Sequence, residues 1–179
     1  MDMPQFEKLI RDLSKSIKES TDKRLHILLL HLYAEHYINL LCKNNHISVS
    51  KSCSCCSDCS DKRQLSFNEK IESLIKEEIL DENLLKPFKL LNQIRNKMVH
   101  YISPDNKKIK KWILEFSPDT SKEVLYLFTA PSEKFLISVI AAIAHVYKKI
   151  SNENIDIAII KDEDTKKWSV DINNIEICL

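Results

Sequence analysis

The chain has 179 residues, of which 44% are hydrophobic, enough to build the core of one domain. Its 27 Lys and Arg residues balance 26 Asp and Glu residues, and a net charge of +1 excludes a protein drawn to nucleic acid by its overall charge alone. Glycine is absent, which argues against a fold with many tight β turns, because glycine usually supplies their positive φ angles. We therefore expect a mainly α protein.

Membrane insertion and secretion are not expected. The sequence contains no run of 18 uninterrupted apolar residues, the length that a membrane-spanning helix needs. Near the N-terminus, Asp2, Glu7, Lys8 and Arg11 stand where a signal peptide requires an apolar stretch. We expect a cytoplasmic protein with no membrane partner.

Two helices are predicted in the first 44 residues. In the first, apolar residues recur at helical spacing between charges, which predicts an amphipathic helix: Phe6, Leu9, Leu13 and Ile17. The second, KRLHILLLHLYAEHYINLLCK, follows Thr21 or Asp22 as a cap. It is apolar nearly all the way round, which predicts a helix buried on every side.

The few polar residues of this second helix form one narrow stripe. His31, Glu35 and Asn39 follow each other at four-residue intervals. Polar groups on a buried helix need partners. The stripe therefore marks either structural hydrogen bonds at the edge of the core or the border of a site or subunit interface.

A polar insertion over residues 44–66 carries a cluster of cysteines, CSCCSDC. In a cytoplasmic protein such a cluster favours a metal site, because thiols are kept reduced there. Four thiolates can bind zinc tetrahedrally, although the spacing is closer than in paired CxxC motifs. An oxidation-prone loop and a redox sensor are the alternatives. The candidate zinc ligands are Cys53, Cys55, Cys56 and Cys59.

Helical periodicity resumes after the insertion. FNEKIESLIKEEIL, capped by Ser66, and DENLLKPFKLLNQIRNKMVHYI, capped by Asp81, predict two helices, with Pro87 kinking the second or delaying its start. PSEKFLISVIAAIAHVYKKIS predicts a long apolar helix, and IDIAIIKDEDTKKWSVDI predicts two strands joined by a charged turn. The expected domain is an antiparallel helical bundle over residues 1–152, with residues 153–179 as a small C-terminal β-hairpin extension.

The stretch IRNKMVHYISP places an arginine on an apolar face. On a helical wheel with Leu84 at zero, Arg95 lies at about 20°, within the apolar stripe. A guanidinium there requires a carboxylate, such as Glu35, or an anion site. Asn96 and His100 share a face at i, i+4, and the wheel puts His100 about 140° from Arg95, although Pro104 forces the helix to end nearby.

The run SFNEKIESLIKEEILDENLLKPFKLLNQIRNKMVHY resembles the HEPN superfamily (higher eukaryotes and prokaryotes nucleotide-binding), including its relatives of the mannitol-repressor type. Those helical domains carry an arginine, usually a polar residue next to it, and a histidine four to six residues beyond the arginine. Arg95, Asn96 and His100 match this motif. The similarity covers about residues 21–104, and the helix at 131–151 would complete the bundle.

The resemblance implies a homodimeric, metal-independent endoribonuclease in a toxin or defence setting, with its site where two subunits bring their motifs together. His100 would take the proton of a ribose 2′-hydroxyl, Arg95 would stabilise charge on the phosphate, and Asn96 would orient either one. The product would be a 2′,3′-cyclic phosphate, and catalysis would need no cofactor. Candidate supporting residues are His31, Glu35 and Tyr101. Candidate RNA-binding residues, just beyond the motif, are Lys107, Lys108, Lys110 and Lys111.

Other interpretations also fit the sequence. Some family members pair with nucleotidyltransferase antitoxins that modify a tyrosine two residues after the histidine, so an antitoxin is a candidate partner. Here Tyr101 directly follows His100, which departs from that pattern. Other members are non-catalytic binding or regulatory modules, and the cysteine cluster allows a metal-sensing protein.

Overall fold

The architecture is that of a computed structural model, which describes most of the chain. The described residues are 3–48, 50–52, 62–80, 82–101, 105, 107–109, 111–112, 131–164, 168–172 and 175–178. The named helices are α1 (Met3–Glu19), α2 (Lys23–Asn44), α3 (Phe67–Lys76), α4 (Glu82–Val99) and α7 (Pro131–Ser151). The strands are β1 (Ser50–Ser52), β2 (Lys62–Gln64), β3 (Ile157–Lys161), β4 (Trp168–Ile172) and β5 (Ile175–Cys178).

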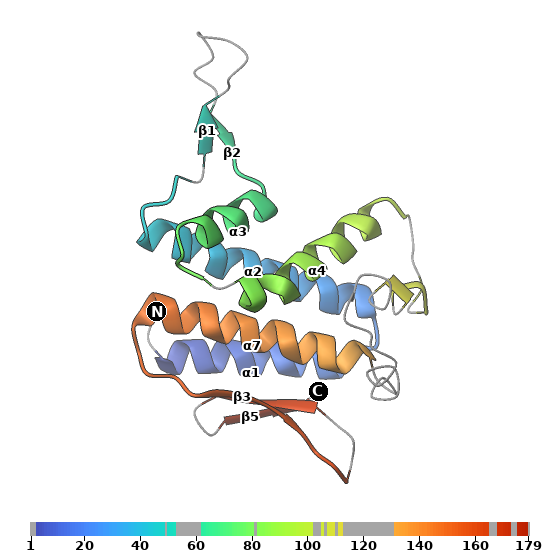
Figure 1. Ribbon diagram of the computed structural model, residues 1–179. Coiled ribbons are helices and arrows are strands. Elements are labelled where there is room, and N and C mark those ends of the chain that lie inside the picture. Colours follow the sequence, from blue (N-terminus) through green and yellow to red (C-terminus); the bar gives the residue numbers. More distant parts are fainter. Residues whose placement is uncertain are drawn as a thin grey trace.

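The helices form a layered bundle, and α7 lies at its centre. It packs against α2 and α4 on one side and against β3 and β4 on the other, while α1 runs beside it (Figure 1). The expectation of a mainly α protein is confirmed for the described residues. In this part of the chain, no helix is both long and apolar enough to span a membrane.

Three aromatic rings join α1, α2 and α7. Phe6 of α1 stacks on Tyr147 of α7, with ring centroids 3.9 Å apart and planes 3° from parallel. Tyr37 of α2 meets Phe6 and Tyr147 edge-on, at 5.7 and 6.1 Å. All three residues are buried, and such offset and edge contacts add to the free energy gained by burial.

The amphipathic pattern of α1 is confirmed, since Leu13 and Ile17 are also buried.

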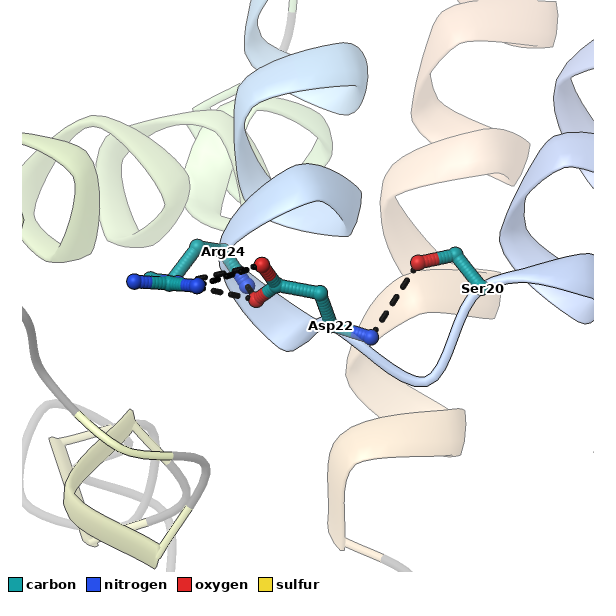
Figure 2. Close-up of polar contacts among 3 residues, drawn as sticks. All are labelled: Ser20, Asp22 and Arg24. Carbon is teal, nitrogen blue, oxygen red and sulfur yellow. Dashed lines mark hydrogen bonds and ion pairs between the residues drawn. The ribbon is translucent and has the colours of Figure 1, made fainter.

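A compact polar corner sets the start of α2. Asp22 is the N-cap, and its carboxylate accepts hydrogen bonds from the backbone N–H and the guanidinium of Arg24 (Figure 2). The Asp22 backbone N–H donates to the Ser20 hydroxyl at 3.1 Å. The side-chain hydrogen bond from Arg24 lowers the pKa of Asp22 to about 2. The carboxylate therefore stays ionised at the positive end of the helix dipole, where a negative charge is stabilising.

The expectation that α2 is buried on every side is wrong. Leu25, Leu28 and Leu32 are 42, 45 and 62% exposed. The other faces of α2 pack against α1, α3, α4 and α7, but spacings of three and four residues keep these three leucines on one face that no described element covers. We call Leu25, Leu28 and Leu32 the leucine stripe.

Residues close in the sequence set the ends of α3 and α4. Ser66 and Glu69 form a capping box at the start of α3, with each side chain bound to the backbone N–H of the other residue. α4 runs through Pro87 without ending there, so the helix does not begin late. Asp81, its expected cap, lies outside the described residues. The helix ends at Val99, consistent with the boundary that Pro104 imposes.

Both small sheets lie outside the helical bundle. Within the insertion, β1 and β2 pair antiparallel from Ser50↔Gln64 to Ser52↔Lys62 and project away from α3 (Figure 1). At the C-terminal end, β3 and β4 form the predicted hairpin, and β5 adds a third antiparallel strand that the sequence analysis did not predict. Val170, Ile172 and Ile177 are buried between this sheet and the helices.

Candidate functional site

The predicted motif lies at the C-terminal end of α4. Arg95 is half-buried, and its Nη1 donates a hydrogen bond to the side-chain oxygen of the exposed Asn96 at 3.0 Å. His100 is exposed, directly after the last residue of α4. Within the described part of the chain, no hydrogen bond joins His100 to Arg95 or Asn96. Arg95 and Asn96 thus form a pair, and His100 stands apart from it.

Arg95 does not form the ion pair that was one alternative for it. The carboxylate of Glu35 lies 3.7 Å from Lys70 Nζ, so a lysine of α3 takes the place considered for the arginine. Across the described residues, Arg95 has no carboxylate partner. A half-buried guanidinium without a carboxylate is a natural site for a phosphate group.

A largely buried polar network connects three helices and includes Asn92, which lies about one turn before Arg95 on α4. Asn92 of α4 donates from Nδ2 to Asn68 of α3 at 2.9 Å, and its Oδ1 lies 3.1 Å from Nε2 of His31 on α2. Because Asn92 Oδ1 can only accept, His31 carries its proton on Nε2. Its Nδ1 faces Glu35 at 3.8 Å. We call Asn68, Asn92, His31, Glu35 and Lys70 the interhelical network.

Burial lowers the pKa of His31. Desolvation is the main cause that lowers the pKa of His31, and the positive charge of Arg95 adds to it. The hydrogen bond with Asn92 and the charge of Glu35 act in the opposite direction. The influence of Arg95 also places its guanidinium within electrostatic range of His31. The network is therefore coupled electrostatically to the arginine of the motif.

The polar stripe on α2 was predicted, but its partners on the other helices were not. His31 and Glu35 belong to the interhelical network, whereas Lys70, Asn68 and Asn92 were missed. A weak signal existed: Asn92 stands between the apolar Leu91 and Ile94. That signal marks a buried polar residue without identifying its partner.

The predicted lysines lie beside the end of α4. Lys107, Lys108 and Lys111 are exposed, and Lys110 lies outside the described residues. The Lys108 ammonium is 3.8 Å from the centre of the Tyr101 ring. The structure therefore brings cations and an aromatic ring together next to His100.

The candidate zinc ligands belong to the insertion between α2 and α3. Cys53, Cys55, Cys56 and Cys59 lie outside the described residues, between β1 and β2. Among residues that the structure does describe, no group of three or more His, Cys, Asp or Glu side chains is arranged to hold a metal ion. Cys42 is a buried free thiol, and burial raises its pKa.

The chain was compared with protein-family models, with curated proteins and with solved structures. No match was found. Its function therefore has to follow from the chemistry of the site and from the motif in the sequence.

Proposed function

We propose that this protein is a metal-independent endoribonuclease of the HEPN type, acting in a toxin or defence setting. The observation that carries the proposal is the half-buried Arg95, which is hydrogen-bonded to Asn96 and has no carboxylate partner in the described part of the chain. His100 follows five positions later, directly after the last residue of the same helix. These are the residues and the spacing of the motif that the chain resembles.

The chemistry needs a base and an anion-binding group. His100 is exposed and can take the proton of a ribose 2′-hydroxyl, which then attacks the adjacent phosphorus atom. The Arg95 guanidinium stabilises the added negative charge on the phosphoryl oxygens. Asn96, already bonded to Arg95, orients that guanidinium. The bond between phosphorus and the 5′-oxygen of the next nucleotide breaks, that oxygen takes up a proton from water, and a 2′,3′-cyclic phosphate remains.

A second subunit would complete the site. If the geometry of α4 is continued past Val99, His100 projects about 140° from Arg95, so one helix would not direct both at the same phosphate. The leucine stripe on α2 and Val99, which is 68% exposed beside the motif, are apolar surfaces of the kind that subunit interfaces bury. A homodimer formed through these surfaces would bring two motifs together.

Disrupting the leucine stripe tests the dimer. We expect Leu32→Glu to convert a wild-type dimer into a monomer, because it would bury a carboxylate in an apolar interface, and to abolish RNA cleavage with it. Ile160→Glu is the matched control, since Ile160 is 41% exposed on β3, on the opposite side of α7 from α2. Light scattering after size-exclusion chromatography gives the mass of each variant. A Leu32→Glu protein that stays dimeric would contradict this interface.

The activity itself is tested with a mixed RNA pool. Purified protein is incubated with RNA in EDTA, and the product ends are analysed. Cleavage with 2′,3′-cyclic phosphate ends is expected, because the mechanism uses the substrate's own hydroxyl and no metal ion. Absence of cleavage by a folded dimer would refute the proposal.

A non-catalytic binding or regulatory module is the second candidate. It is favoured by the separation of His100 from the Arg95–Asn96 pair within one subunit. Such a module would bind RNA or a protein partner, an antitoxin included, without cleaving RNA. The cleavage assay separates the two candidates.

A structural zinc in the cysteine cluster stays a prediction from the sequence. Four thiolates would bind about one zinc ion per chain in protein purified without chelators, and the fourfold Cys→Ser variant at Cys53, Cys55, Cys56 and Cys59 would lose it. Elemental analysis measures the zinc content. A wild-type content below about 0.2 zinc per chain would count against the site. RNA cleavage is expected to survive the loss of zinc, because the proposed mechanism assigns no role to a metal.

A further inference from the structure

An aromatic pair lies directly next to the motif. The rings of Tyr101 and Trp112 are in contact, with centroids 5.0 Å apart and planes inclined by 48°. Tyr101 immediately follows His100 and is 41% exposed, whereas Trp112 is only 3% exposed. The buried indole thus supports a tyrosine ring that reaches solvent one residue from the proposed base.

After the motif, a short helical segment, described at residues 107–109 and 111–112, is held against the bundle. The Asp105 carboxylate accepts a hydrogen bond from the backbone N–H of Lys108 at 2.7 Å, and the Asp105 carbonyl accepts one from Ile109 at 3.1 Å. Ile109 and Trp112 are buried on its inner side. Their burial fixes the outer side, and with it the position of the lysines relative to Tyr101.

The ammonium groups of two lysines lie near these rings. Lys108 Nζ lies 3.8 Å from the centre of the Tyr101 ring and 5.9 Å from that of Trp112. Lys97 Nζ lies 5.3 Å from the Trp112 ring. Lys107 and Lys111 are exposed on the same short segment. An exposed aromatic ring bordered by lysines is the arrangement by which proteins hold single-stranded nucleic acid, with bases on the rings and phosphates at the ammonium groups.

We propose that Tyr101 is a stacking platform for one unpaired base of single-stranded RNA, with Lys108 binding an adjacent phosphate. This inference rests on the proposed function, because it takes RNA as the ligand, and it adds the substrate class: unpaired RNA with a base next to the phosphate that is cleaved. A base in a duplex is stacked on its neighbours and does not offer its face to a tyrosine. The platform therefore selects single-stranded regions.

In the unbound protein, the Lys108 ammonium occupies a face of the Tyr101 ring. A stacked base is a stronger partner for an exposed ring than an ammonium that is also well hydrated. On binding, the base takes the place over the ring and the ammonium moves to a phosphate. Tyr101 and Lys108 thus contribute separately, one through the base and the other through the backbone.

The test measures binding in the absence of cleavage. A labelled 12-nucleotide 2′-O-methyl RNA has no 2′-hydroxyl to attack phosphorus, so the wild-type protein cannot cleave it by the proposed route. Its affinity is measured by fluorescence anisotropy, beside an abasic oligomer of the same length and charge. The variants are Tyr101→Leu, which keeps an apolar contact with Trp112 but lacks a flat face, and Tyr101→Phe, which keeps the ring. Thermal melting confirms that both variants are folded.

We expect Tyr101→Leu to weaken binding of the base-containing oligomer about tenfold and binding of the abasic oligomer less than twofold. Tyr101→Phe is expected to bind both like wild type. Equal affinities of Tyr101→Leu and wild type for the base-containing oligomer, or equal losses on both oligomers, would overturn the platform. Failure of the nuclease proposal appears elsewhere, as uncleaved natural RNA, and the two results are independent.

The role of Lys108 has its own measurement. Lys108→Gln is expected to weaken both oligomers alike and to reduce the slope of log affinity against log salt by about 0.7, the value for one phosphate contact on a single strand. An unchanged slope would contradict the phosphate contact.

Discussion

Replacing His100 with alanine is expected to slow RNA cleavage by about 10²- to 10⁴-fold, the range that general base catalysis usually contributes. Arg95→Ala is expected to slow it by about 10²- to 10³-fold, because the charge on the phosphoryl oxygens then has no guanidinium partner. Arg95→Lys should restore only part of the rate, since an ammonium keeps the charge but lacks the planar fork that binds two oxygens. Initial rates on one defined RNA substrate measure these effects.

The control for these variants is Gln93→Ala. Gln93 is exposed on α4, two residues before Arg95, and the proposed mechanism gives it no role. Its rate should equal that of wild type. Full activity of His100→Ala, in preparations shown to be free of contaminating nuclease by the double Arg95→Ala/His100→Ala protein, would rule out His100 as the base.

Mixed dimers locate the two residues relative to each other. If the site takes Arg95 from one subunit and His100 from the other, a dimer of one Arg95→Ala and one His100→Ala subunit retains one intact site. Random mixing of the two inactive proteins would then recover about a quarter of the wild-type activity. No recovery, with subunit exchange demonstrated, would place both residues of a site on one subunit.

The largest expected effect on stability comes from the buried Lys70. Glu35→Gln should lower the free energy of unfolding by about 3 kcal/mol, because it leaves an ammonium that is 2% exposed without a carboxylate. Lys70→Met should cost less, about 1 kcal/mol or below, since Met fills much of the same space and the 38% exposed Glu35 can be hydrated instead. Glu35→Gln costs more than Lys70→Met because Lys70 is buried, whereas Glu35 is partly exposed. Urea denaturation at pH 7 measures both values.

The double variant Glu35→Gln/Lys70→Met gives a sharper test. With the lysine gone, Glu35→Gln should have little further effect, so the double variant should be close to Lys70→Met. Glu82→Gln is the matched control, because Glu82 is exposed and its pair with Lys89, at 3.6 Å, is at the surface. Equal losses for Glu35→Gln and Lys70→Met would show that burial of the ammonium does not govern this pair.

Local features of the fold could be predicted from the sequence. Asp22 is one of the two caps considered for α2, and Ser66 caps α3 and α1 is amphipathic, as predicted. These features depend on residues within about four positions of each other, a distance over which hydrogen-bond and helix geometry is nearly independent of the rest of the chain. The long helix α7 was predicted for the same reason.

The candidate site was only partly predictable. The motif residues can be read directly from IRNKMVHY, but their surroundings cannot. Glu35 pairs with Lys70, which lies 35 positions away on another helix. It does not pair with Arg95, the partner that the helical wheel suggested. The contact of Tyr101 with Trp112 also depends on how the chain returns to the bundle after the motif.

The sequence by itself determined where α3 and α7 begin, which face of α1 is apolar, and which residues form the motif. Only the tertiary structure decided that the leucine stripe is exposed, that Lys70 is buried against Glu35, and that a third strand, β5, joins the C-terminal hairpin. The physical reason is the range of the interactions. Capping and periodicity act along a few residues of one helix, whereas burial and ion pairing depend on which other elements pack against that helix.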